Sequence, residues 1–405
     1  MYFKLAWRNI WRNRRRTLIT ATSVFMAVIL ALVMRSMQLG SYQRMVDNVV
    51  RFYSGHAQIH LRGYHDEPAI DNSFVPNDTL KQILSANTAI QNWVPRLESF
   101  ALSSAGTLTK GTMVVGFDPE AENRLTRLKD KLIAGNYTGK NEHAILVAEG
   151  LAEYLKLKVN DTIVLLGQGY HGVTAADKYP VKGIVRFPSP ELNRGVVYLP
   201  LSQAQQLYGT GDRLTSIALL VNNEADAGMV AAQLRKSIGA MPFEVLDWKE
   251  MMPEMVQLIE ADNSGGIIVI SVLYLIIAFG IFGTVLMMLA ERRHEFGILV
   301  SIGMRKLKLA GVVMLETLFI ASLGVMAGAT AGIPVIAYFH SHPIRVSGEL
   351  ASTFERFGME PVFPFSNDPS IFLSQAAVIF VISALLSLYP LARLLKLNAT
   401  NALKS

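Results

Sequence analysis

Few residues in this chain have the chemistry for metal binding or catalysis, and they are widely spaced. His56, His60 and His65 form the densest histidine cluster, and the alternating pattern of Ala57 to Leu61 predicts a strand between the first two. At about 3.3 Å per residue, His56 and His60 would lie about 13 Å apart on one face of that strand. Ligands lie only about 2 Å from a metal ion, so these two cannot share one. We expect surface histidines on the edge of a sheet.

Two patterns approach known catalytic motifs without completing them. Gly139-Lys140 lacks the leading glycine and the following Ser or Thr of a nucleotide-binding loop. His294-Glu295 begins a zinc-protease pattern, but Ile298 stands where the second histidine is needed. The chain has no cysteine, which excludes disulfides and thiolate metal sites. The sequence therefore predicts a chain that is no enzyme by itself and binds no metal or cofactor.

The elements that would position any site are dominated by long apolar runs. Each of four runs is long enough for a helix that crosses a bilayer core, which takes about 20 residues. Between the first and second runs lies an interval of mixed α and β pattern, long enough for a large domain. The predicted fold class is a membrane α-helical protein with four transmembrane helices and a large α+β periplasmic domain inserted between the first and second. The runs are Leu18 to Met34, Gly265 to Leu289, Leu309 to Phe339 and Ile371 to Leu391.

Charge predicts the orientation of these helices. Three segments flanking the runs (residues 1–16, 291–308 and 393–405) hold 14 of the 38 basic residues and 2 of the 32 acidic ones. The positive-inside bias places both termini and the 291–308 connection in the cytoplasm, and the large domain outside. Basic residues beside a span also anchor lipid headgroups, and we expect no nucleic-acid partner. The predicted organisation is a cytoplasmic amphipathic helix 1–16, transmembrane helices 17–38, 264–290, 309–340 and 370–392, a periplasmic domain 39–263, a cytoplasmic connection 291–308, a periplasmic loop 341–369 and a cytoplasmic tail 393–405.

Strands and helices alternate within the predicted periplasmic domain. Pro76 to Ala86 and Ala225 to Ile238 read as amphipathic helices, the second ending at Gly239. A boundary between two lobes near Ala134 to Gly139 is possible. Short β-rich runs lie at Ala57 to Leu61, Ala144 to Ala148, Thr162 to Leu166, Tyr179 to Val185, Gly195 to Leu199 and Ser216 to Val221.

The third run carries two unusual features. Gly324, Gly328 and Gly332 form a small-residue stripe that lets another helix approach closely, either within this subunit or in a second copy. Glu316 is an acid within the span, where it must face a polar interior or be paired. A structural acid near the cytoplasmic end is one interpretation, and a proton relay is the other.

The connection 291–308 is charged at both ends with apolar residues between, namely Phe296, Ile298, Leu299 and Ile302. A short amphipathic helix there could dock in a groove of a cytoplasmic partner, or merely join two spans. One string decides between these interpretations. It reads Glu291-Arg292-Arg293-x-Glu295-Phe296-Gly297-Ile298-x-x-x-Ile302-Gly303-Met304.

This string closely resembles the coupling-helix signature of the LolC/LolE, MacB and FtsX permeases, the type VII ABC transporter superfamily. Trp7 to Thr17 resembles that family's N-terminal helix, and Val115 to Pro119 and Ala148 to Ala152 resemble stretches of its periplasmic domain. The tail from Tyr389 resembles its closing pattern, with Asn401 in place of the usual Glu. The length and the lack of a fused ATPase fit the lipoprotein-releasing LolC/LolE group best.

The resemblance implies partners and roles. A LolD-like ATPase dimer would hold ATP and Mg, and would act on the coupling residues of the string in a complex with a second permease copy or a sister permease. A lipoprotein would move toward a periplasmic carrier, and lipid-cargo contacts would fall on Met26, Ile29, Val33, Phe279 and Phe282. The loop from Gly167 to Lys178, with Gln168, Tyr170 and His171, corresponds in position to a carrier-binding hairpin, and a plain connecting loop is the alternative.

The same resemblance leaves other functions open. One is MacB-like mechanotransmission or efflux of another substrate, and another is FtsX-like regulation of a periplasmic cell-wall hydrolase. A secondary transporter that uses Glu316 is a more distant alternative. The expected location is the bacterial inner membrane.

Overall fold

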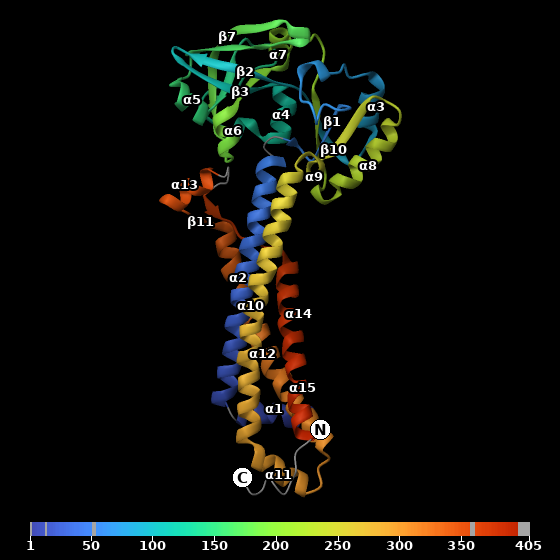
Figure 1. The fold of residues 1–405 in the computed structure, drawn as a ribbon, viewed down its shortest axis with the longest axis vertical. Helices are drawn as coiled ribbons and strands as arrows, with labels where there is room; N and C mark the ends of the chain where they lie inside the picture. The colour runs from blue at the N-terminus through green and yellow to red at the C-terminus, as the bar shows by residue number, and fades with distance from the viewer. Residues whose placement is uncertain (1, 13, 51–53, 357–360, 396–405) are drawn as a thin grey trace. The chain divides into compact units, whose positions relative to one another are not determined.

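The computed structural model describes residues 2–12, 14–50, 54–356 and 361–395. They form two compact units (Figure 1). The helical unit comprises residues 1–43, 259–345 and 362–405, and the α+β unit comprises residues 44–258 and 346–361. Most of the predicted tail 393–405, including Asn401, lies outside the described residues.

Four helices of the described chain are long and apolar enough to cross a membrane: Thr17–Asn48, Pro253–Glu291, Lys306–Ser341 and Pro369–Pro390. The first two continue past the predicted ends of their apolar runs, because no proline interrupts the backbone hydrogen bonds there. In these two helices, the run of apolar residues therefore covers only part of the helix. The helices here are α1 (Tyr2–Arg12), α2 (Arg14–Val49), α10 (Pro253–Glu291), α11 (Arg293–Ser301), α12 (Lys306–Ser341), α14 (Pro369–Leu386) and α15 (Leu388–Leu395).

The helical unit has an apolar core in which α2, α10, α12 and α14 meet. Val24, Val28 and Leu32 of α2 are fully buried there beside Ile281 of α10 and Ile379 of α14. Between α12 and α14 the chain forms β11 (Ile344–Arg345), α13 (Glu349–Arg356) and β12 (Val362–Phe363), and the two short strands pair antiparallel.

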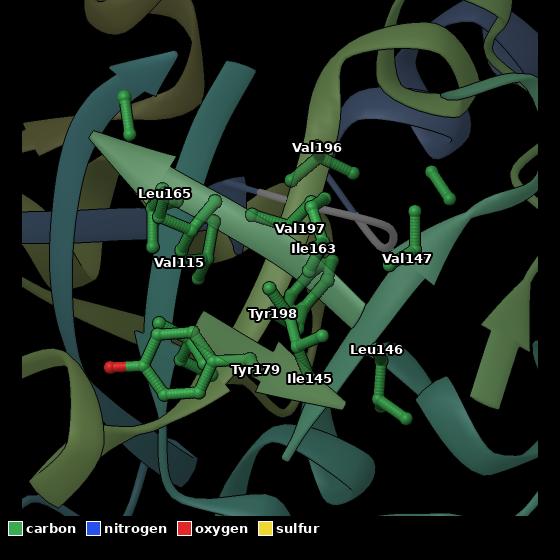
Figure 2. Close-up of a cluster of buried hydrophobic side chains, with 14 of the residues drawn as sticks. Val115, Ile145, Leu146, Val147, Ile163, Leu165, Tyr179, Val196, Val197 and Tyr198 are labelled. Atoms are coloured by element: carbon green, nitrogen blue, oxygen red, sulfur yellow. The ribbon is translucent and has the colours of Figure 1, made fainter. Parts of the chain in front are cut away.

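The α+β unit contains one lobe built around a closed barrel. The pairings run from β2 to β3, β8, β5, β7 and β6, and β6 pairs again with β2. Closure removes the free sheet edges that invite unwanted pairing. Figure 2 shows the apolar core of this lobe, with Val115, Ile163 and Tyr198 from three of the strands. The strands are β2 (Ile90–Ala105), β3 (Leu108–Phe117), β5 (Ile145–Ala148), β6 (Thr162–Gln168), β7 (Thr174–Val185) and β8 (Val196–Pro200), and the helices of this lobe are α4 (Pro119–Thr126), α5 (Glu149–Leu155), α6 (Pro190–Gly195) and α7 (Leu201–Tyr208).

The second lobe is a small sheet covered by two helices. Its strands β10 (Phe243–Asp247), β1 (Ala57–Leu61) and β9 (Ser216–Val221) continue into the first half of β2. Leu80 and Leu84 of α3 (Asp78–Ala86) and Leu234 of α8 (Ala227–Ile238) pack on this sheet. A short helix, α9 (Trp248–Met251), follows β10.

Arg96 lies where the two lobes join. It pairs across β2 with Ser216 of β9 on one side and Phe117 of β3 on the other. Its buried guanidinium donates to both carboxylate oxygens of Glu122 in α4, at 2.9 and 2.7 Å. Burial lowers the pKa of Arg96, but the charge and hydrogen bonds of Glu122 raise it by more, so the guanidinium stays protonated.

The expected boundary near Ala134 to Gly139 is wrong. β4 (Leu132–Gly135) is hydrogen-bonded to β7 within the sheet, so no lobe ends there. The lobes divide at Arg96 and near Thr215 instead, because the chain leaves the second lobe along β2 and returns along β9.

The expectation of surface histidines on a sheet edge is wrong for His56 and His60, whereas His65 is exposed. β1 lies between β10 and β9, and both His56 and His60 are buried. His56 Nδ1 accepts from the Val221 backbone N–H, and His60 Nε2 lies 2.7 Å from Gln58 Oε1. Burial, with a smaller effect of His65, lowers the pKa of His60 to about 4. Both imidazoles are thus neutral core groups in a central strand.

Candidate functional site

A short helix, α11, joins α10 to α12, and both of its ends follow from its sequence. It begins after Arg292, whose backbone is not helical, with the Phe296 N–H bonded to the Arg292 carbonyl. At its other end the Gly303 N–H bonds to Val300 and the Met304 N–H to Leu299. This is a Schellman turn, which needs a left-handed residue such as Gly303 with φ of +101°.

One face of α11 is buried against other helices of the unit. Phe296 is almost fully buried and packs with Ile10 of α1 and with Leu309 and Val313 of α12. The Arg292 guanidinium lies over its ring at 5.1 Å. Phe296 therefore anchors α11 from within, and it is not available to a partner as the apolar pattern suggested.

A chain of ion pairs links three helices at this place. Arg12 of α1 lies 2.6 Å from Glu295, and Arg292 Nε donates to the same Glu295 oxygen at 3.0 Å. Arg292 Nη1 donates to both oxygens of Glu316 in α12, at 3.0 and 2.7 Å. Glu316 is fully buried, so the acid that the sequence places within the span is paired there.

The charge state of Glu295 follows from these contacts. Partial burial raises the pKa of its carboxyl, but hydrogen bonds from Arg292 and Arg12 lower the pKa by more. The pKa of Glu295 is therefore below its ordinary value. Glu295 is thus an anion between two arginines. It fastens α11 to α1, while Arg292 fastens α11 to α12.

The other face of α11 is exposed and mixed in character. Ile302, at the C-terminal end of α11, is 80% exposed, and Ile298 of α11 and Leu307 at the start of α12 are exposed as well. The charged or basic residues Glu291, Arg293, His294 and Arg305 flank these apolar side chains on the exposed surface. An exposed apolar centre with a charged rim is the anatomy of a protein-docking surface. We call this set the α11 docking face.

The small-residue stripe of α12 lies against α2 of the same chain. A Cβ at Gly324 would stand 2.7 Å from Val24 Cβ, and one at Gly328 would stand 2.8 Å from Val28 Cβ. At Gly332 it would meet Leu32 Cδ1 at 2.8 Å. Of the two expected uses of the stripe, the structure places it in packing within the subunit.

The five residues expected to face a lipid cargo do not share one environment. Met26 and Phe279 are exposed, whereas Ile29 and Val33 are half-buried. Phe282 contacts the Tyr389 ring of α15, with centroids 4.8 Å apart. Phe282 therefore packs between helices, and Met26 and Phe279 remain free to meet lipid.

The expected loop from Gly167 to Lys178 is a tight β-hairpin. β6 and β7 pair from Thr162 opposite Pro180 to Gln168 opposite Thr174, which leaves only residues 169–173 at the tip. The tip packs on its own α+β unit: the His171 N–H donates to Asp71 at 2.7 Å, and the Arg213 guanidinium lies 4.7 Å from the Tyr170 ring centroid. The Gln168 side chain is exposed at the end of β6.

The sequence did not predict two residues of this arrangement, Leu307 and Arg12, or the partner of Glu316. Leu307 lies beyond the recognised string, and Arg12 was treated only as a lipid and topology anchor. The partner of Glu316 was not identified either, although Arg292 stands within the same string. The excess of arginine in residues 1–16 indicates that ion pairs can form there, but the sequence does not indicate which arginine pairs with which acid.

No group of three or more His, Asp or Glu side chains among the described residues could hold a metal ion. The contacts described between α1, α11 and α12 are apolar packing and ion pairs of arginine with glutamate. The chemistry of this arrangement is that of docking and of fixed ion pairs.

Two protein-family models match this chain. Residues 17–237 match the MacB-like periplasmic core domain, and residues 267–399 match the FtsX-like permease C-terminal domain. The periplasmic region of MacB from Actinobacillus actinomycetemcomitans is similar in structure, with a TM-score of 0.37, 13% identity, 53% of this chain and 97% of that chain covered.

Curated relatives extend over most of the chain. The lipoprotein-releasing system transmembrane protein LolC of Neisseria meningitidis is 22% identical over 80% of both chains. LolC of Xylella fastidiosa strain 9a5c is 23% identical over 76% of both. An uncharacterised ABC transporter permease of Methanocaldococcus jannaschii is 20% identical over 81% of this chain and 82% of its own. This chain belongs to the type VII ABC transporter permeases, with a MacB-like periplasmic core domain and an FtsX-like C-terminal domain.

Proposed function

We propose that this permease releases lipoproteins from the outer leaflet of a bacterial inner membrane, driven by a separate LolD-like ATPase dimer. Both termini and α11 lie in the cytoplasm, and the α+β unit lies in the periplasm. The similarity to LolC proteins over most of the chain supports the lipoprotein as cargo. The basic residues of 1–16 and 291–308 support the orientation.

The observation that carries the proposal is the pairing of Arg292 with Glu316. It fixes the first turn of α11 to the interior of α12, so a displacement of the α11 docking face moves a long helix rather than a loop. Arg12 and Glu295 extend the same connection to α1. A partner that closes on ATP and grips Ile298, Ile302 and Leu307 would push on the helical unit through these contacts.

The proposal is tested by purification in mild detergent followed by reconstitution. The tagged permease should bring down an ATPase and a second permease copy or sister permease. In proteoliposomes the complex should release a lipidated protein to a soluble carrier when ATP is added. Reversing Glu295 to Lys places a third cation beside Arg12 and Arg292, and should abolish ATP-driven release. Full release by that variant, or a complex without any ATPase, contradicts the proposal.

One observation favours a second function. The β6–β7 tip contacts Asp71 and Arg213 of its own unit, through the His171 N–H and the Tyr170 ring, and these contacts would have to move for the tip to act as a free hook. MacB-like mechanotransmission without a carrier needs no hook. The discriminating variant is Tyr170→Ala with His171→Ala: carrier-dependent release falls if the tip binds a carrier, and carrier-independent ATP-driven motion persists in either case.

A further inference from the structure

A group of hydrogen-bonded polar side chains joins α2 to α10 in the helical unit. Arg35 Nη1 donates to Asn263 Oδ1 at 2.8 Å and to Gln38 Oε1 at 2.7 Å. Gln38 Nε2 donates to the backbone and carboxylate oxygens of Asp262, at 3.2 and 3.3 Å, and the Tyr42 hydroxyl donates to the same carboxylate. We call these five residues the polar clasp.

The spacing of the clasp follows from helix geometry. Arg35, Gln38 and Tyr42 are three and four residues apart, so they lie on one face of α2. Asp262 and Asn263 follow each other on α10, where one turn later the backbone carries Gly266. A Cβ at Gly266 would stand only 1.9 Å from Gln38 Nε2. The lack of a side chain at Gly266 is therefore what lets Gln38 reach Asp262.

Another face of α2 is fixed at the same level. The Ser36 hydroxyl donates to the Ser366 carbonyl at 2.7 Å, and the Ser366 N–H donates to the Ser36 carbonyl at 2.9 Å. A Cβ at Gly40 would stand 2.6 Å from the Pro364 carbonyl oxygen. The segment leading into α14 thus holds α2 on one side, and the polar clasp holds α10 on the other.

The path of the chain gives this arrangement a mechanical consequence. The chain passes from α2 to β1, and it returns from β10 through α9 to α10. β1 and β10 are antiparallel neighbours, with Ala57 opposite Asp247. If α2 slid past α10 by one helical turn, about 5.4 Å, the two connecting segments would absorb the displacement and the lobe would not move. Motion reaches the lobe efficiently only if the two helices move together.

We infer that the polar clasp locks α2 and α10 into one transmitting body, and that Gly266 is a positioning residue for coupling. The inference rests on the proposed function in that an ATPase supplies the motion. It goes beyond it by assigning Arg35, Gln38, Tyr42, Asp262 and Gly266 to the transmission step. The alternative is that α2 and α10 must separate during the ATPase cycle.

Two adjacent glycines provide a matched pair of variants. Gly266→Ala displaces Gln38 from the clasp, whereas a Cβ at Gly265 meets nothing within 4 Å. Both changes raise helix propensity equally, so that contribution cancels. In the reconstituted complex with its co-purifying ATPase, we expect Gly266→Ala to lower lipoprotein released per ATP hydrolysed by at least about fivefold, since two hydrogen bonds are lost. Gly265→Ala should keep the wild-type ratio, and both should keep basal ATP turnover.

Cross-linking gives the complementary test, because the chain contains no cysteine. Gln38→Cys with Gly266→Cys removes the Gln38 contacts of the clasp and should uncouple the complex. A short bis-maleimide that joins the two cysteines should restore coupling, while each single-cysteine variant treated alike should not gain. If the cross-linked complex stays uncoupled, the helices must part and the inference is wrong. It is equally wrong if Gly266→Ala is fully coupled.

Two further measures keep the result unambiguous. Should Gly266→Ala fail to assemble, Tyr42→Phe takes its place, because it removes one clasp hydroxyl and nothing else. ATP-dependent deuterium uptake of the α+β unit reports transmission without any cargo. A wild-type complex that shows this change but releases no lipoprotein contradicts the proposed function. The clasp is then still judged by whether Gly266→Ala abolishes the uptake change and the cross-link restores it.

Discussion

Arg292 Nη1 lies 2.7 Å from one carboxylate oxygen of Glu316 and 3.0 Å from the other. The Arg292 side chain is 7% exposed and that of Glu316 is not exposed at all. Such a buried pair repays little of its own desolvation, so its value lies in fixing one geometry. Here the fixed geometry is the attachment of α11 to α12.

Replacing one member of this pair should therefore cost more than replacing both. Glu316→Leu leaves the buried Arg292 guanidinium with only the half-exposed Glu295 as a counter-ion, and we expect a loss of up to about 3 kcal/mol in unfolding free energy. The double variant Arg292→Leu with Glu316→Leu should recover most of that loss, yet fail to stimulate ATP turnover on cargo addition. Thermal unfolding in detergent and ATPase assays check the two parts. A Glu316→Leu variant as stable as wild type would refute the pairing.

Substitution of Gly303 should be unfavourable because of its backbone conformation and not because of steric crowding. Its φ is +101°, and a Cβ there would meet nothing within 4 Å. Gly303→Ala should strain the Schellman turn by about 1 kcal/mol and reorient Ile302, weakening the hold of the ATPase. Gly311→Ala, also without neighbours but inside α12, is the control and should be neutral or slightly stabilising. The measurement is the amount of ATPase retained on the immobilised permease.

The α2–α12 contact should resist any enlargement of its glycines. Gly328→Val puts a side chain into Val28, and we expect a destabilisation of about 1 to 3 kcal/mol. Gly280→Val on α10 carries the same change into open space and provides the control. Detergent unfolding midpoints compare the two. Equal midpoints would show that the stripe does not pack against α2.

His60 should make the protein sensitive to acid. Its folded pKa is about 4, below the unfolded value near 6.5, so the unfolded state binds more protons between these limits. Stability is then full above pH 6.5 and falls as the pH drops toward 4, by about 3 kcal/mol in total. His60→Gln should flatten unfolding midpoints between pH 6.5 and 4. An unchanged slope in that variant would assign the acid sensitivity to other groups.

Part of this architecture was predictable because some signals are local. Apolar length indicates each long helix. The alternation of Ala57 to Leu61 and the β-rich composition of Ser216 to Val221 indicate β1 and β9 at their observed bounds. The Gly239 end of α8 follows from left-handed freedom after an amphipathic run. The short helix within Glu291 to Met304 was predictable because the charge and apolar spacing of this string fit one helix, and α11 lies within it.

The rest depends on contacts that pattern does not encode. β2 carries mixed polar and apolar residues because it bridges the two lobes, and β2 and β3 both leave part of the barrel wall exposed, so neither strand alternates cleanly. His60 became a core residue only because β10 and β9 pair on both sides of β1. The pairing of Arg12 with Glu295 spans most of the chain, and no local rule selects it.

The most direct test of the account asks whether α11 touches an ATPase on the cytoplasmic side. Ile302→Cys introduces the single cysteine of the chain at its most exposed apolar docking position. A photoactivatable thiol reagent on it should cross-link to the ATPase in membranes, more strongly with ATP, and an impermeant reagent added to intact cells should not reach it. Val173→Cys on the α+β unit is the matched control, and should show the reverse pattern. Labelling of the Ile302→Cys variant from outside intact cells, or the lack of any ATPase adduct, would contradict the account.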